Sequence, residues 1–186
     1  MKIALCGMPG CGKSSVAQEL SSRCGCFWFD LDRTICLEEG RSIPEIFASE
    51  GESLFRALEA DALQRIVEDY EDFPVTMVLA LGGGTLQTPL CKNLVKENFN
   101  CIYLRATAEQ LTEDLIQTGI VDRPLLKGCL KEDGAAIDRD ALLCKVRALL
   151  EERKEVYEGC ADIIIDTAAK SYEELAAEIT QKTSLQ

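Results

Sequence analysis

The chain has 186 residues, enough for one domain with a sizeable buried core, and its 32 acidic and 20 basic residues give a net charge of −12. This charge argues against nucleic acid as a partner, because nucleic-acid binding depends on a basic surface. No apolar run is long enough to cross a membrane and no hydrophobic targeting segment precedes the first motif, so we expect a cytoplasmic protein without a membrane partner.

The first motif is a glycine-rich segment at residues 7–14, with the pattern G-x-x-x-x-G-K-S. It lies between a predicted strand (2–6) and a predicted helix (15–24), which is the setting of the phosphate-binding loop of nucleotide enzymes. Its glycines let backbone N–H groups face an anion, and the helix N-terminus adds its positive dipole end. Lys13 is a predicted catalytic residue that reaches the β- and γ-phosphates, and Ser14 is a predicted Mg²⁺ ligand. The predicted ATP-binding residues of this loop are Gly10, Cys11, Gly12, Lys13, Ser14 and Ser15.

Two aspartates follow the second predicted strand, at residues 26–29. Asp30 and Asp32 are two positions apart, so at a strand end they would point the same way, toward the sheet edge where α/β proteins bind ligands. One of them would support Mg²⁺, because the later strand that often ends in a metal-binding aspartate has none here. A polar strand end without a function is the alternative.

Two helices are predicted next. The first begins near Ser42, with Glu45 completing a capping box, and the second covers residues 52–69 after Gly51. Arg56 and Glu59 lie three apart on the second helix and can pair, although an exposed ion pair is the usual outcome of such spacing. Pro74 is expected to stop this segment.

A near-continuous apolar run at residues 75–81 predicts a central parallel strand that is buried on both faces. Three glycines, Gly82, Gly83 and Gly84, follow it and would let a ligand approach the backbone closely; a plain loop is the alternative. Further along we predict a helix at 88–98, a strand at 101–104 and a helix that Thr107 caps and Gly119 ends.

Residues 120–138 show no periodic pattern of apolar residues, which predicts a surface loop or lid. This segment contains Arg123 within the sequence DRPLL. A long helix (138–157), a fifth strand (162–166) and a last helix ending near residue 181 complete the chain. Arg153 lies in a charged stretch of the long helix, so a solvated surface position is its alternative. The alternation of strands and helices predicts a five-stranded parallel sheet with helices on both faces, without giving the strand order.

Taken in order, these motifs resemble the shikimate kinases over essentially the whole chain. The resemblance rests on the phosphate loop (7–14), FDLD (29–32), residues 40–47 and 51–59, LGGG (81–84), RPLL (123–126), and Arg153 four residues before Tyr157. It implies a P-loop, nucleoside monophosphate kinase-like α/β fold with strand order 2-3-1-4-5. The single domain would span 1–186, with a mobile lid at about 115–138 and substrate-binding helices at about 32–60.

The resemblance also implies an activity: transfer of the ATP γ-phosphate to the 3-hydroxyl of shikimate, with Mg²⁺, in aromatic amino-acid biosynthesis. By position, Asp32 would bind the shikimate hydroxyls and act as the base. Arg56, oriented by Glu59, and Arg153 would clamp the shikimate carboxylate. The remaining implied roles fall to Gly82, Gly83 and Gly84 for backbone contacts with the acceptor, Asp30 for Mg²⁺ through water, and Arg123 for catalysis and ATP binding.

One departure from the family stands out, and two other functions remain open. The family often carries a second lid arginine where this chain has Leu115, Ile116 and Gln117. The alternatives are a same-fold kinase of another small hydroxyl substrate, such as gluconate, and a nucleotide-binding regulator without transfer activity. We expect a monomer, because no surface apolar stripe is evident.

Histidine is absent and the ten cysteines form no C-x-x-C pair, so mixed Cys/His zinc sites are excluded. We interpret the cysteines as reduced thiols that serve as small apolar residues. Cys11 is special, because it lies within the phosphate loop. We expect ATP to slow the alkylation of Cys11 more than that of any other thiol.

Overall fold

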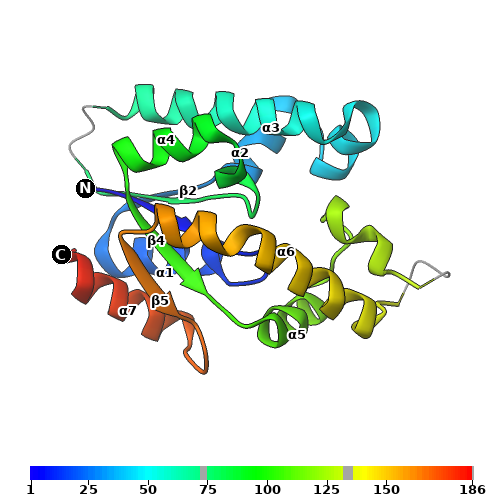
Figure 1. The fold of residues 1–186 in the computed structure, drawn as a ribbon. Helices are drawn as coiled ribbons and strands as arrows, with labels where there is room; N and C mark the ends of the chain where they lie inside the picture. The colour runs from blue at the N-terminus through cyan, green and yellow to red at the C-terminus, as the bar shows by residue number, and fades with distance from the viewer. Residues whose placement is uncertain (72–74, 132–135, 186) are drawn as a thin grey trace.

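Five parallel strands form one sheet in the order β2-β3-β1-β4-β5 (Figure 1). The computed structural model describes residues 1–71, 75–131 and 136–185. In chain order its elements are β1 (Lys2–Cys6), α1 (Lys13–Cys24), β2 (Phe27–Asp30), α2 (Leu31–Glu39), α3 (Ile43–Asp69), β3 (Met77–Ala80), the 3₁₀ helix η1 (Thr85–Gln87), α4 (Pro89–Asn98), β4 (Asn100–Arg105), α5 (Ala108–Thr118), the 3₁₀ helix η2 (Pro124–Cys129), α6 (Arg139–Cys160), β5 (Ile163–Asp166) and α7 (Tyr172–Thr183). The strand order that the resemblance implied is confirmed.

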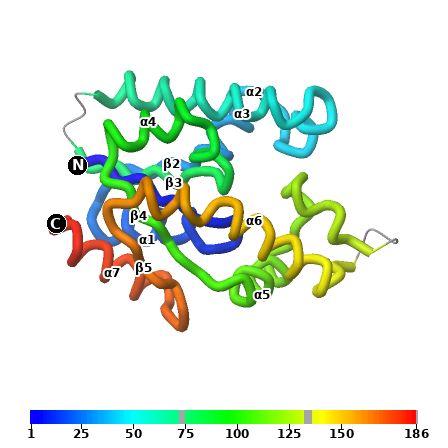
Figure 2. The backbone as a smooth tube through the Cα atoms, in the orientation of Figure 1, coloured from blue at the N-terminus to red at the C-terminus, as the bar shows by residue number. Residues whose placement is uncertain are grey.

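The centre of the sheet is apolar on both faces. In β1, Ile3 pairs with Val78 of β3 on one side and Asn100 of β4 on the other, and Ile3, Ala4 and Leu5 are fully buried. Figures 1 and 2 show α3 and α4 on one side of the sheet and α1 and α7 on the other. Coverage of both faces explains why β1 and β3 are continuous apolar runs rather than alternating patterns.

The connection after β2 differs from the prediction. The strand ends at Asp30, which is the N-cap of an unpredicted helix, α2, and accepts a hydrogen bond from the Arg33 N–H at 3.1 Å. Leu31 and Ile35, four positions apart, bury one face of α2. Asp32 therefore lies in the first turn of α2. The prediction of two carboxylates side by side on one strand was wrong, because the cap turns the chain immediately.

The long helix α3 contains both predicted helical segments. Gly51, with φ 81° and ψ −178°, interrupts it where the prediction placed the boundary, and a side chain would be strained in that conformation. The capping box of Ser42 and Glu45 is confirmed. Pro74, the predicted stop, lies outside the described residues, and α3 ends earlier, at Asp69.

The segment predicted to be irregular, 120–138, is partly regular. It contains η2, and Leu130 and Ile137 form an isolated antiparallel bridge.

The described part of the chain contains no helix with both the length and the apolar character needed to cross a bilayer.

Candidate active site

A pocket of about 580 Å³ opens at the carboxyl ends of β1, β2 and β3. Most of the predicted site residues line it: Gly10, Gly12, Lys13, Ser14, Ser15, Asp30, Asp32, Arg56, Gly83, Gly84, Arg123 and Arg153. Cys11 and Gly82 are buried and do not line it. Residues far apart in the sequence thus converge where parallel sheets bind ligands.

The phosphate loop fixes Lys13 at the base of this pocket. The Lys13 ammonium donates to the carbonyl oxygens of Gly7 at 2.9 Å and Met8 at 3.0 Å. Helix α1 begins at Lys13, so the unpaired N–H groups of its first turn face the same space. A fixed cation beside a helix N-terminus forms a ready binding site for phosphate groups.

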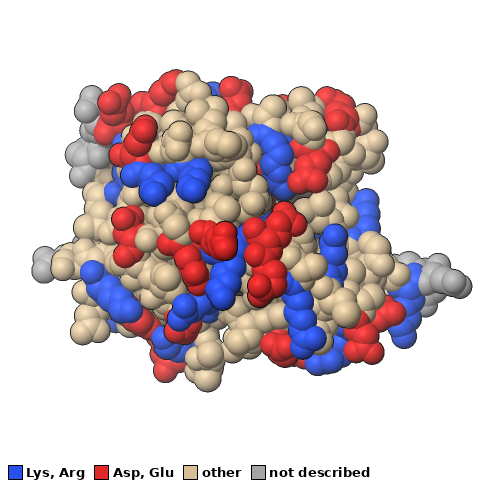
Figure 3. Space-filling model, in the orientation of Figure 1, with Lys and Arg blue, Asp and Glu red and all other residues tan. Residues whose placement is uncertain are grey.

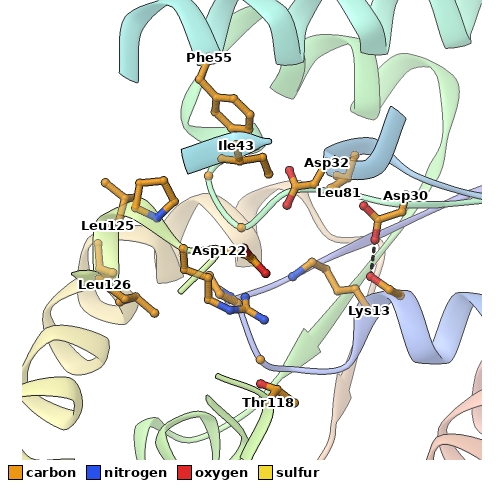
Figure 4. A pocket seen from close by; sticks show the side chains of 18 of the residues that line it. Lys13, Asp30, Asp32, Ile43, Phe55, Leu81, Thr118, Asp122, Leu125 and Leu126 are labelled. Carbon is orange, nitrogen blue, oxygen red and sulfur yellow. Dashed lines mark hydrogen bonds between the residues drawn. The ribbon is translucent and has the colours of Figure 1, made fainter. Parts of the chain in front are cut away.

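Ser14 and Asp30 bring a hydroxyl and a carboxylate together beside Lys13. The Ser14 hydroxyl donates to Asp30, drawn as the dashed line in Figure 4. Among the described residues, no group of three acidic or cysteine side chains forms a metal cluster. A metal here would take most of its ligands from phosphate and water, which suits Mg²⁺.

Asp32 projects into the pocket, and Figure 4 shows it together with Lys13 and Asp122 around the same space. Burial raises the pKa of Asp32 to about 7, and the nearby carboxylates Glu59 and Asp30 add to the rise, while Lys13 and Arg123 act against it. A carboxylate that titrates near neutral pH is well matched to accepting a proton from a hydroxyl.

Arg56 is held by two glutamates rather than exposed to solvent. Its guanidinium pairs with Glu59, which is 0% exposed, and with Glu52 at 2.8 Å. Burial acts to lower the pKa of Arg56, but Glu59 and Glu52 raise it above its usual value. A Cβ atom at Gly84 would overlap this guanidinium, so Arg56 lies directly against the glycine backbone. The predicted Arg56–Glu59 pairing is confirmed, and the alternative of an exposed surface ion pair is wrong.

Arg153 is 3% exposed, although its helical neighbours Glu152 and Lys154 are exposed. Its Nη1 donates to the Gly83 carbonyl oxygen at 3.0 Å, and the Tyr157 hydroxyl donates to the same oxygen. Its Nε has no hydrogen-bond partner, and among the described residues no carboxylate lies within 4.0 Å of the guanidinium. A buried cation without an anionic partner is unfavourable, so this geometry favours an anionic ligand.

Arg123 enters the pocket from the residue before η2. Burial lowers the pKa of Arg123, although Asp32 and Asp122 act in the opposite direction, and the guanidinium stays charged at neutral pH. Leu125 and Leu126 follow it along the pocket wall (Figure 4). Ile116, where the family often has an arginine, packs against the core and lines no described cavity.

Several residues of the site were not predicted from the sequence. Thr85, which is 0% exposed, donates to Glu59 at 2.6 Å, and Asp122 lines the pocket beside Arg123. Tyr172 lines this pocket and also a second cavity of about 600 Å³, which Cys11 and Gln110 line as well. Only the position of Thr85, directly after the three glycines, hinted at a role.

The surface of the molecule carries both signs of charge. On the face drawn in Figure 3, acidic and basic side chains of the described residues lie interspersed and do not separate into patches of one sign. In the pocket, an anionic substrate meets the positive charges of Lys13, Arg56, Arg123 and Arg153.

Comparison with known proteins places this geometry in a family. A protein-family model described as "Shikimate kinase" matches residues 9–184. A shikimate kinase of Chlorobaculum parvum is 37% identical over 180 residues, which cover 97% of this chain and 90% of that protein. A shikimate kinase of Chlorobium limicola is 35% identical over 179 residues, covering 96% and 84%.

Solved structures of shikimate kinases have the same fold as this chain. A shikimate kinase from Acinetobacter baumannii in complex with shikimate superposes with a TM-score of 0.84 at 28% identity, covering 98% of this chain and 92% of the other. A shikimate kinase from Aquifex aeolicus superposes with a TM-score of 0.73 at 27% identity, covering 99% and 96%.

Proposed function

The chain belongs to the shikimate kinase family, and from this premise we propose that it transfers the γ-phosphate of ATP to the 3-hydroxyl of shikimate. The products are shikimate 3-phosphate and ADP, in aromatic amino-acid biosynthesis. The chain is thus an ATP-dependent kinase with an alcohol acceptor.

The observation that supports an acceptor with a carboxylate is a pair of guanidinium groups at adjacent glycines. Arg56 lies against Gly84, and Arg153 donates to the Gly83 carbonyl oxygen. Two planar guanidinium groups at neighbouring glycines suit one carboxylate, which guanidinium groups bind through directed pairs of hydrogen bonds. Shikimate carries one carboxylate and three hydroxyls, and the Asp32 carboxylate in the same pocket can accept a hydrogen bond from a substrate hydroxyl.

On the donor side, we assign the phosphates of ATP to the loop and to Lys13, with Arg123 closing on them from η2. Ser14 and Asp30 would hold Mg²⁺, the latter through water, and the metal would neutralise charge on the transferred phosphate. Asp32 takes the proton of the attacking hydroxyl. The nucleoside extends into the second cavity, along Tyr172 and Gln110.

We assign the substrate-binding helices to about 32–60 and the lid to about 115–138, and described residues of both segments line the pocket. Ile43, Phe47 and Phe55 line the pocket from the helices, and residues 118, 119 and 121–126 line it from the lid. Closure of the lid over both substrates would exclude water and limit ATP hydrolysis. A monomeric state and a cytoplasmic location stay predictions from the sequence.

The test is ADP release from ATP–Mg²⁺ with shikimate, with gluconate, with AMP and with no acceptor. We expect release only with shikimate. Release with gluconate alone would support the other small-hydroxyl kinase. ATP binding without release for any acceptor would support the nucleotide-binding regulator, and would withdraw the acceptor roles of Arg56 and Arg153.

A further inference from the structure

We propose that Thr85 is a positioning residue that sets the affinity for the acceptor through Glu59 and Arg56; the proposal rests on the proposed function. Thr85 is the first residue of η1, directly after the three glycines. It is 0% exposed and lines no described cavity, so it does not itself touch a substrate.

The hydroxyl of Thr85 holds one oxygen of a buried carboxylate. Thr85 Oγ1 donates to Glu59 Oε1 at 2.6 Å, while Glu59 Oε2 pairs with Arg56. Among the described residues, Thr85 is the one hydrogen-bond donor to Oε1. The two oxygens of Glu59 thus have separate partners, and this division fixes the rotation of the carboxylate and the direction of the Arg56 guanidinium.

The surroundings leave little room for another arrangement. A Cβ atom built on Gly82 would lie 2.5 Å from Glu59 Oε1, 2.7 Å from Asp32 Oδ1 and 2.9 Å from Thr85 Oγ1. Three oxygen atoms therefore crowd around the Gly82 backbone, and the Thr85 hydroxyl donates its proton to one of them, Glu59 Oε1. This crowding explains why a glycine stands at a position that does not line the pocket.

Without the hydroxyl, Glu59 Oε1 would be buried and unpartnered, which is unfavourable for a carboxylate. The carboxylate would then turn both oxygens toward Arg56, its remaining partner. Arg56 would be drawn toward α3 and away from the space beside Gly84, where we place the acceptor carboxylate. Among the described residues, the hydrogen bonds of Thr85 go to Glu59, Gly82 and Thr88 and not to the phosphate loop, so ATP binding should be unaffected.

The experiment compares Thr85→Val, which keeps the shape and removes the hydroxyl, with Thr85→Ser, which keeps the hydroxyl. We expect Thr85→Val to raise the KM for shikimate about tenfold, with the KM for ATP within about twofold and kcat within about threefold of the wild type. Thr85→Ser should restore the KM for shikimate to within about twofold of the wild type.

Thr112→Val is the matched control. The Thr112 hydroxyl is equally buried and donates to the Ala108 carbonyl oxygen at 2.7 Å in α5, outside both cavities. The Thr112→Val substitution should leave the KM for shikimate unchanged. If Thr85→Val does not fold, Thr85→Ala takes its place, with the same expected rise in KM.

A second measurement tests the route through Glu59. In a Glu59→Gln background, Thr85→Val should add little to the rise in KM, because the two residues act as one unit. Equal effects of Thr85→Val and Thr85→Ser, an unchanged KM, or a fully additive double variant would each overturn the proposal. A wild type that does not phosphorylate shikimate would instead overturn the proposed function.

Discussion

Arg153 of α6 and Gly83 of the loop after β3 are joined by a hydrogen bond of 3.0 Å, from Nη1 to the carbonyl oxygen. The guanidinium is buried, and its Nε is left without a partner. The Tyr157 hydroxyl, one helical turn later, donates to the same oxygen. Arg153 is therefore held in place before a substrate arrives, so an anionic acceptor meets a positioned cation.

Replacing Arg153 with Met should raise the KM for shikimate by about 10²-fold, because a buried, charge-assisted contact is lost. Arg153→Lys should not restore the affinity, since a point charge cannot reproduce two directed N–H groups. Lys154→Met, at the exposed neighbouring position, is the control and should leave the KM unchanged. Steady-state kinetics with saturating ATP measures all three; a normal KM in Arg153→Met would remove Arg153 from the acceptor site.

Asp32→Asn should leave ATP binding near normal and lower phosphate transfer by about 10²-fold or more, because the amide cannot accept the hydroxyl proton. ATP binding is followed by calorimetry, and turnover by ADP release. Asp61→Asn, on the exposed side of α3 in an ion pair with Arg65, is the control and should change neither quantity. Unchanged turnover in Asp32→Asn would show that another group takes the proton.

The pH profile follows from the pKa of Asp32, which burial and then Glu59 and Asp30 raise to about 7. The base must be ionised to work, so kcat/KM should fall as the pH drops through about 7. Asp32→Asn should abolish this limb of the profile. A wild-type profile that stays flat down to pH 5 would contradict the assignment of Asp32 as the base.

The same shift predicts an effect on stability. A carboxyl whose folded pKa is raised contributes its stability below its unfolded pKa, near 4, and loses it as the pH rises to about 7. The gain in free energy of unfolding from Asp32→Asn should therefore grow between pH 4 and pH 7 and stay constant above. Thermal melts of both proteins across this range test it, and a gain independent of pH would argue against a buried, titrating carboxyl.

ATP–Mg²⁺ should slow the alkylation of Cys11 more than that of any other thiol. The Cys11 side chain is 4% exposed and lines the second cavity, where we place the nucleoside, so bound ATP would cover it and hold the loop closed. The exposed Cys144 on α6 is the internal control, whose rate should not depend on ATP. Mass spectrometry of peptides gives each rate, and equal labelling of Cys11 with and without ATP would refute the prediction.

The fold was largely predictable, because a parallel α/β sheet leaves strong local patterns. The apolar run of β3, the capping box at Ser42 and the helix cap at Thr107 marked element positions that the structure confirms. Helix α2 was missed because it is short and because Asp30 and Asp32 suggested a strand end. Its start depends on the side-chain cap of Asp30, which apolar periodicity does not reveal.

The pocket was predictable where a motif carries its own chemistry, as in the loop around Lys13. Burial was not. Arg153 sits in a stretch of charged residues, and only the packing of α6 against the loop after β3 shows that it alone of these faces inward. Thr85 and its contact with Glu59 were missed for the same reason, since the two residues meet only through the packing of η1 on α3.

The central claim is the transfer of phosphate to one hydroxyl of shikimate, and the most direct measurement is a ³¹P NMR spectrum of the reaction with ATP–Mg²⁺ and shikimate. We expect the γ-phosphate signal to be replaced by a phosphomonoester signal coupled to the proton at carbon 3, with ADP formed in equal amount. Release of inorganic phosphate alone, or a phosphomonoester at another carbon, would contradict the claim.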